Sequence, residues 1–539
     1  MTMLISRRSL VLGAALALPV QGIVRASDLK TPFTPDRRQR RVLETRWEAA
    51  QAEFKSSPPA HATNLDEERY DDRRASFSKT MPHNNLGEVD PEAYRQWLAI
   101  LANGDPAGFD QVPRDPQAIE RLNDPQATYA TDLVGPDATA LVLAPPPAFA
   151  SSEMAAEMTE LYWLALLRDV PFRDYATDTL ASAAVADLRL AGFSEVATSN
   201  LFRGISGGDL RGPFVSQFLW HDIPYGLKIV DQRFPVPTPG QNFLTRFEDW
   251  LACQRGARAT NTVRMGAEPR YITTYRSLAE YVHRDFSFQP FMDAALIILR
   301  MGGERGDDLL SPTNPYRGSH TQFGDITLGN KNLLTLLAQA SLLAQKTSYY
   351  QKWQVHRRAR PEAFGGRIDV HLSGRKSYDI DPTILHSEVL ARAKSMNGSY
   401  LLPMAYPEGC PTHPSYPAAH AVNAGACATI LKAFVNESYE IPQPVQASAD
   451  GVRLESWRGE PLTLGGEIDK LASNIALARD AAGVHFRSDS ISGLKLGEAV
   501  AIGLLADYSR TYSERFDGFT LTRFDGDKVR ISGGSVQSI

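Results

Sequence analysis

The chain has 539 residues, with 57 lysines and arginines against 62 aspartates and glutamates, for a formal net charge of −5. Its 43% apolar and 22% charged residues are globular values, and the charge excludes a general nucleic-acid binder. Three cysteines, Cys253, Cys410 and Cys427, exclude a complete disulfide framework. A pair between Cys410 and Cys427 stays open, although Cys427 falls in an apolar segment where a buried free thiol is commoner.

The N-terminus predicts an export signal of the twin-arginine type. Ser6-Arg7-Arg8-Ser9-Leu10 precedes an apolar run that ends at Val20, and Val24-Arg25-Ala26 offers a small-residue cleavage site. This run is too short to span a membrane comfortably, and no later stretch reaches about 18 unbroken apolar residues. We therefore exclude residues 1–26 from the fold. We predict an exported protein, periplasmic or secreted, without membrane insertion after signal removal.

The sequence of the mature chain predicts a mainly helical protein. A basic run, Arg37–Arg41, lies near its start. This run indicates a solvated face at a helix start rather than a binding arm. Helix signals follow at 41–54, 91–103, 151–169, 174–191, 241–256, 277–285 and 289–301. Residues 302–329 form a long connection rich in glycine and polar residues, a kind of loop that is often functional. We place a soft boundary there, which closes an N-terminal mainly helical region over residues 27–330.

After this boundary the sequence predicts a helical bundle over residues 331–515. Its helices are expected at 332–359, 385–396, 418–435, 466–482 and 492–512. Pro417 suits the first helical position of the third of these helices. Residues 516–539 form a C-terminal tail, in which alternating residues around Asp525-Gly526-Asp527 predict a β-hairpin over 519–532.

Three blocks of this bundle carry the candidate chemistry. They contain, in chain order, Lys352 and Arg360; His413 and His420; and Arg479 and His485, followed by Asp489. Three fixed cations can take the oxygens of a tetrahedral oxyanion, with arginine as a planar fork and lysine as a point charge. One histidine can bind or attack the central atom, and the other can move protons. Taken alone, the middle block also fits a structural histidine in a proline loop.

The spacing of the blocks sets two geometric conditions. Lys352 and Arg360 are about 80° apart round an ideal helix, so one helix ended by Pro361 would turn both toward one pocket. Arg479 and His485 are about 240° apart, and a straight helix would not point both at one anion. Gly483 lies between them and is a natural helix terminator. We therefore expect the helix to break at Gly483.

The order and spacing of the blocks resemble the vanadium-dependent haloperoxidases and the related type 2 phosphatidic acid phosphatases. The matching blocks are Lys352…Arg360-Pro361, Pro417-Ala418-Ala419-His420 and Arg479…His485. The phrases Tyr350–His356, Arg360–Gly366 and Pro411–Pro417 are similar to the red-algal and cyanobacterial bromoperoxidase branch in particular. This resemblance implies the helical-bundle fold that haloperoxidases share with acid phosphatases.

The resemblance implies a vanadate cofactor and assigns roles to the candidate residues. Vanadium would bind the imidazole of His485, while Lys352, Arg360, Arg479 and the backbone N–H of Ala419 would neutralise the vanadate oxygens. His420 would move protons, and Lys352 would polarise a peroxide oxygen for attack by halide. Hydrogen peroxide and halide would be the substrates. The product would be hypohalous acid or its equivalent, which halogenates small organic acceptors.

Two positions depart from the family pattern of serine and glycine before the acid–base histidine. Ala418 lacks the hydroxyl with which a serine would bind an oxyanion oxygen. Ala419 keeps its backbone N–H but would be strained if the site needed a positive φ. These departures bear on affinity and rate more than on the type of reaction.

Three further residues bear on halide choice and on the surroundings of the site. His413 stands seven residues before His420, where the family's bromoperoxidases carry histidine. Tyr349 matches neither the arginine nor the tryptophan found before the lysine in relatives. Asp285 resembles the family acid that pairs with a site arginine, although an acid at a helix end is more often only solvated. Bromide is therefore favoured, iodide is easier still, and chloride is disfavoured.

Two other functions remain open on the sequence. In an exported acid phosphatase, His485 would attack phosphorus and His420 would protonate the leaving group. A periplasmic oxyanion-binding protein without catalysis is supported only by Ala418 and Ala419, and retention of both histidines argues against it. Because family members often assemble from helical protomers, we expect a homo-oligomer, at least a dimer.

Overall fold

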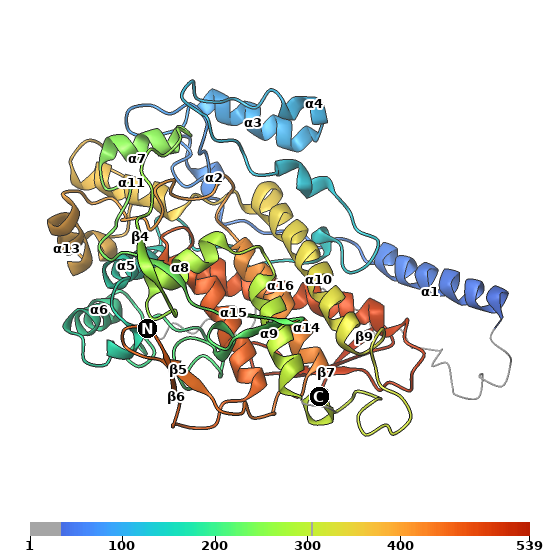
Figure 1. Cartoon of the computed structure of the whole chain (residues 1–539). Coiled ribbons are helices and arrows are strands. Elements are labelled where there is room, and N and C mark those ends of the chain that lie inside the picture. The colour runs from blue at the N-terminus through green and yellow to red at the C-terminus, as the bar shows by residue number, and fades with distance from the viewer. Residues whose placement is uncertain (1–33, 303–305) are drawn as a thin grey trace.

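The computed structural model describes residues 34–302 and 306–539, so the expected export signal lies outside the described residues. The described chain is mainly helical, as predicted (Figure 1). Its helices are α1 (Pro35–Lys55), α2 (Asp66–Arg69), α3 (Pro91–Asn103), α4 (Pro106–Phe109), α5 (Ser152–Leu167), α6 (Thr179–Leu190), α7 (Phe247–Gln254), α8 (Tyr275–Arg284), α9 (Gln289–Met301), α10 (Asn330–Tyr350), α11 (Pro361–Leu372), α12 (Pro382–Leu385), α13 (Glu388–Asn397), α14 (Ala419–Phe434), α15 (Leu464–Ala481) and α16 (Arg487–Ser509).

The described strands are short and pair only with near neighbours in the chain. They are β1 (Ile223–Tyr225) with β2 (Lys228–Val230), β3 (Phe234–Pro237) with β4 (Met265–Arg270), β5 (Val445–Ala447) with β6 (Leu454–Ser456), and β7 (Phe519–Thr522) with β8 (Lys528–Ser532) and β9 (Ser535–Ser538). All these pairs are antiparallel. The predicted C-terminal hairpin is confirmed, and a third strand extends it.

Helix α14 lies at the centre of the bundle and packs against α10, α15 and α16. It is buried almost throughout because its residues are small and apolar. Two glycines permit the close approach of α14 and α16. A Cβ on Gly425 would overlap the carbonyl oxygen of Leu494, and a Cβ on Gly497 would overlap that of Val422. This packing fixes the start of α14, where His420 lies.

The expected single helix over 332–359 is wrong. Helix α10 ends at Tyr350, and the chain continues through one π-helical segment, Gln351–His356 (η7). Arg357 then takes a positive φ of 38°, and α11 begins at Pro361. Proline at this first position starts a helix, since its missing N–H is not needed there. Lys352 and Arg360 therefore belong to two successive elements and not to two faces of one helix.

Other sequence predictions have mixed outcomes. The helix expected from 418 begins at Ala419, with Ala418 as its N-cap, so Pro417 precedes the helix and does not start it. Cys253, Cys410 and Cys427 are free and buried. One apolar core draws on residues from both sides of the 302–329 connection, and the division at that point stays a prediction. In the described part of the chain, no helix combines the length and apolarity needed to cross a bilayer.

Candidate active site

Lys352 is held inside the bundle by the π-helical segment. Its side chain is fully buried, and Nζ donates to the carbonyl oxygens of Pro414 at 2.7 Å and Ser415 at 2.8 Å. Burial and the positive charges of Arg360 and Arg479 hold the pKa of Lys352 well below its ordinary value. The first block is therefore bound to the loop that precedes α14, and Lys352 forms no ion pair with a carboxylate among the residues that the structure describes, although the charge of Asp489 acts on it.

Arg360 is the N-cap residue of α11, and its guanidinium connects the second and third blocks. Nε donates to the carbonyl oxygen of His413 at 2.9 Å, and Nη1 to that of Val484 at 2.7 Å. Nη1 also lies 3.0 Å from Nε2 of His485, and Nη2 lies 3.0 Å from Nδ1 of His413. The ring of Tyr349 lies 5.4 Å from that of His413. These contacts place the halide candidates His413 and Tyr349 beside the cationic site.

His485 lies in the turn between α15 and α16, where the sequence predicted a break. Gly483 has a φ of 83°, and its N–H donates to the carbonyl oxygen of Asp480 at 2.8 Å. The chain then reverses, and α16 begins at Arg487. The break at Gly483 is confirmed, and it brings His485 to Arg360. Burial and the charge of Arg360 hold the pKa of His485 well below its ordinary value, although the contact with Asp489 raises it.

Asp489 organises this part of the site, although its place after His485 in the sequence indicated no particular role. Its Oδ2 lies 3.0 Å from Nδ1 of His485 and accepts from the Ser415 hydroxyl. Its Oδ1 accepts from Nη1 of Arg358 at 2.7 Å, and its backbone carbonyl accepts from the N–H of Ala418 at 3.0 Å.

Burial alone would raise the pKa of Asp489, but Arg358 and His485 lower it well below its ordinary value. Because the Asp489 carboxylate accepts the hydrogen on Nδ1 of His485, the lone pair of this imidazole lies on Nε2, which faces Arg360. The spacing of four residues between His485 and Asp489, across a helix start, is the sequence signal that could have revealed this pair.

Arg479 comes from the last turn of α15 and is buried beside Tyr406. Nη1 donates to the carbonyl oxygen of Val282 at 3.1 Å and lies 3.5 Å from the Tyr406 hydroxyl. Its Nε is buried without a hydrogen-bond partner among the described residues. An unpaired buried donor is costly, and an anion would satisfy it. Val282 belongs to helix α8, and the same helix ends at Asp285, which contacts the next residue of the site, His420.

His420 lies in the first turn of α14, with 25% of its side chain exposed. Its Nε2 lies 3.1 Å from Oδ1 of Asp285, the C-cap residue of α8. Asp285 was expected to resemble an acid that pairs with a site arginine, but its side-chain partner among the described residues is His420. The physical reason is position: the end of α8 faces the start of α14, while Arg479 meets α8 one turn earlier. The imidazole of His420 is thus oriented by a carboxylate and reaches solvent.

Ala418 and Ala419 are buried at the start of α14. Ala418 is extended, with a φ of −67°, and its side chain gives the helix no cap. Ala419 does not have a positive φ, so the strain considered for this position does not arise. The helix start keeps its free N–H groups, which favour an anion.

The side chains of the candidate site fit a tetrahedral oxyanion. Lys352, Arg360 and Arg479 are buried, and none of the three forms an ion pair with a carboxylate in the part of the chain that the structure describes. Buried charges are normally paired, because an isolated one is strongly unfavourable. Together with the imidazole of His485, they match the donor set that vanadate or phosphate needs. The site therefore has the composition predicted for a vanadate site.

Comparison with known proteins shows which class of protein this fold and site define. Residues 389–514 match the family described as the VCPO second helical-bundle domain. The structure of the homohexameric second vanadate-dependent bromoperoxidase from Ascophyllum nodosum is similar, with a TM-score of 0.89 and 27% identity over 97% of this chain and 95% of that chain. The fold is that of a vanadium haloperoxidase.

Relatives with curated functions extend this similarity to the whole chain. The vanadium-dependent bromoperoxidase of Ascophyllum nodosum is 34% identical over 94% of both chains. That of Corallina pilulifera is 33% identical over 85% of this chain and 91% of its own. The chain belongs to the vanadium-dependent haloperoxidase family. It is an enzyme that uses vanadate as its cofactor, with peroxide and halide as substrates.

Proposed function

We propose that this haloperoxidase oxidises bromide or iodide with hydrogen peroxide to a hypohalous acid equivalent, which halogenates small organic acceptors. The observation that carries the proposal is the cluster of three buried basic side chains, Lys352, Arg360 and Arg479, which lie beside His485 and form no ion pair with a carboxylate among the described residues. Bromide is favoured because the curated relatives are bromoperoxidases and because His413 stands beside Arg360. Chloride, which is harder to oxidise, is not expected to be a substrate.

In this proposal, vanadate supplies a Lewis acid that activates peroxide without changing oxidation state. Asp489 accepts the Nδ1–H of His485, and this hydrogen bond leaves Nε2 as the nitrogen that holds the cofactor. Lys352, Arg360 and Arg479 would neutralise the oxygens of the bound oxyanion, and the N–H groups at the start of α14 would add to the same field. The burial of these side chains and the unpaired Nε of Arg479 among the described residues support these roles.

His420 moves the protons in this scheme. Asp285 accepts from Nε2–H of His420, so Nδ1 keeps the lone pair that takes a proton from peroxide. The other candidate site side chains, Lys352, Arg360, His413, Arg479 and His485, are buried, whereas His420 is partly exposed. His420 therefore exchanges its proton with solvent, and the substrates approach from its side.

Two further proposals concern the cell and the assembly. The twin-arginine motif supports export to the periplasm or beyond. The solved relative from Ascophyllum nodosum is a homohexamer, which supports self-association of this chain.

The test uses purified apo-protein with orthovanadate, hydrogen peroxide and bromide, and bromination of a cyclic diketone as the readout. We expect activity only with vanadate, and we expect phosphate to compete with reconstitution because it fits the same cations. A parallel assay offers a phosphomonoester. Turnover of the phosphomonoester with no vanadate-dependent bromination would overturn the proposal in favour of a phosphatase.

A further inference from the structure

Helix α1 protrudes from the body of the protein (Figure 1). It also exposes an apolar seam. None of its 21 residues is buried. Leu43, Trp47 and Phe54 are 58%, 65% and 92% exposed, and Ala50 between them is also exposed. Their spacing of four, three and four residues places them on one stripe of the helix. That spacing is the one by which one helix packs against another in a coiled coil.

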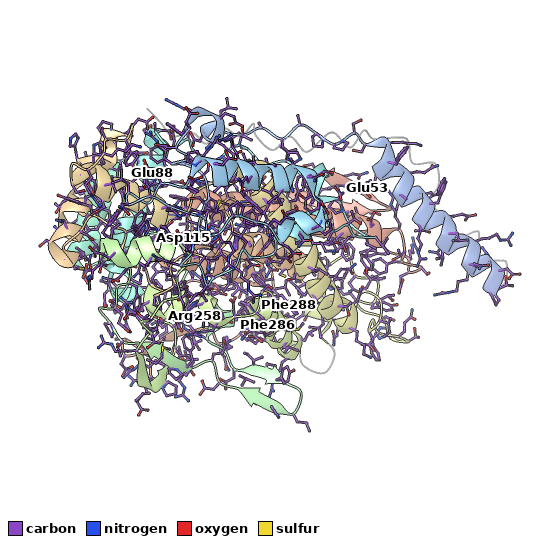
Figure 2. All side chains as sticks on the ribbon, turned by 90° about the horizontal axis from the view of Figure 1, so that it is seen from above. Glu53, Glu88, Asp115, Arg258, Phe286 and Phe288 are labelled. Carbon is purple, nitrogen blue, oxygen red and sulfur yellow. The ribbon has the colours of Figure 1, made fainter. Side chains whose placement is uncertain are left out.

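The opposite face of α1 is the one that meets the rest of the chain. Val42, Thr45 and Ala49 are half-buried, and Arg41 Nη2 donates to the carbonyl oxygen of Tyr512 at 3.2 Å. At the other end of the helix, Glu53 accepts from the N–H of Asp137 at 2.9 Å, and Figure 2 shows Glu53 at the end of α1 that adjoins the body. These contacts direct the seam away from the body, and no residue in the described part of the chain buries it.

We propose that this seam packs against the same seam of a second copy of this chain, with the two α1 helices antiparallel. This inference deepens the proposed self-association and rests on it. In an antiparallel pair, Leu43 lies opposite Phe54 of the partner subunit, and Trp47 lies opposite Ala50 of the partner subunit. Trp47 then meets the small side chain of Ala50, and Leu43 and Phe54 form an apolar contact toward each end of the seam.

The charges beside the seam support the same arrangement. Arg46 flanks the seam on the same side as Glu53, and in an antiparallel pair Arg46 meets Glu53 of the partner subunit. Because the two helices are related by a twofold axis, this opposite-charge pair occurs twice in the interface. Glu53 accepts one hydrogen bond from Asp137, and a carboxylate has further acceptor sites. In a parallel pair, Arg46 would face Gln51 of the partner subunit, and this complementarity would be lost.

The size and composition of α1 also constrain the occupant. A helix of 21 residues is about 31 Å long, and one seam is smaller than the roughly 800 Å² per partner of a standard interface. The α1 pair therefore adds to contacts between the bodies. A membrane surface is the main rival, since α1 is amphipathic and contains several arginines. Glu44 and Glu53 flank the narrow seam, and the charge complementarity of Arg46 with Glu53 favours a protein partner.

The test measures self-association of the mature chain, residues 27–539, by sedimentation velocity. We expect Trp47→Asp to raise the dissociation constant at least tenfold, while Leu190→Asp, on the exposed face of α6, leaves it unchanged. Arg46→Glu should weaken association, and Arg46→Glu with Glu53→Arg should restore it. Because α1 buries no residue, circular dichroism should show the same fold in every variant.

Three results would overturn the proposal. They are a wild-type chain that stays monomeric at tens of micromolar, a Trp47→Asp variant that assembles like wild type, and a double charge exchange that fails to restore assembly. Trp47-dependent binding to vesicles containing phosphatidylglycerol, with unchanged self-association, would assign the seam to a membrane instead. Bromination is measured on the same samples. Loss of bromination with intact assembly would count against the proposed activity and not against the seam.

Discussion

At the residue scale, the two site histidines have opposite surroundings. His485 is buried and held by Asp489, whereas His420 is partly exposed and paired with Asp285. We expect His485→Ala to abolish vanadate retention, because it removes the proposed ligand of vanadium. His420→Ala should retain vanadate and lose roughly 10²–10⁴-fold in turnover, the usual contribution of a positioned proton carrier. Vanadium content after gel filtration and bromination rate separate the two effects. Equal loss of vanadium from both variants would show that the roles are wrong.

Ala418 offers a second residue-scale prediction. It is the N-cap of α14 and supplies no capping side chain. In Ala418→Ser, the hydroxyl oxygen would accept from the second or third N–H of the helix, which stabilises by about 1 kcal/mol. Its O–H would donate to the bound oxyanion. A hydrogen bond to a charged group contributes roughly 1.5–3 kcal/mol, so we expect vanadate to bind about tenfold more tightly or better.

Titration of apo-protein with vanadate, with recovered bromination as the readout, measures this affinity. The thermal midpoint of the apo-protein measures the cap separately. A more stable apo-protein with unchanged affinity would show that the side chain at position 418 does not face the anion.

At the element scale, the turn between α15 and α16 decides whether the third block can work. Gly483 has a φ of 83°, and an added Cβ would lie 3.0 Å from Sδ of the buried Met404. We expect Gly483→Ala to destabilise the fold by about 1–2 kcal/mol through its backbone conformation alone. It should also weaken vanadate binding by displacing His485.

Gly398→Ala is the matched control for this turn. It has a similar φ of 78° after α13, with nothing within 4 Å of the added Cβ. Urea unfolding and vanadate titration should therefore show a stability loss in both variants and an affinity loss only in Gly483→Ala. Unchanged affinity in Gly483→Ala would mean that His485 does not depend on this turn.

Some of these structural elements could be predicted from the sequence alone, and others could not. Helix α9 was predicted at the limits that the structure gives it, and the break at Gly483 followed from the spacing of Arg479 and His485. The π-helical segment before Arg357 was not predictable in this way, because one π turn leaves no change in apolar period. The partner of Asp285 was missed because the contact between α8 and α14 depends on tertiary packing across 135 residues.

At the scale of the whole molecule, buried neutral histidines make stability depend on pH. His356 is an example outside the candidate site: both ring nitrogens are buried without a partner among the described residues. Burial and nearby positive charges lower its pKa to about 3. An unfolded histidine binds a proton below about pH 6.5, so the unfolded state gains protons first and the free energy of unfolding falls as pH falls from 6.5 toward 3.

Replacement of this residue should remove part of that dependence. We expect His356→Phe to reduce the loss of stability between pH 6.5 and 5.0 by up to about 2 kcal/mol, at 1.36 kcal/mol for each pH unit. Urea unfolding of wild type and variant at both pH values measures the difference. The same pH dependence in both proteins would mean that His356 is protonated in the folded chain.

The buried cations make the stability of the whole molecule depend on an oxyanion as well. Lys352, Arg360 and Arg479 lie close enough together to lower the pKa of Lys352, so an anion that binds only the folded chain relieves their repulsion. A ligand at 100 times its dissociation constant stabilises by about 2.7 kcal/mol. We expect orthovanadate to raise the midpoint of thermal unfolding, and phosphate to raise it less because it lacks the bond to His485. Arg479→Gln should lose most of the shift, while Arg95→Gln, an exposed cation on α3, should keep it. An equal shift in Arg479→Gln and wild type would place the stabilising oxyanion at another site.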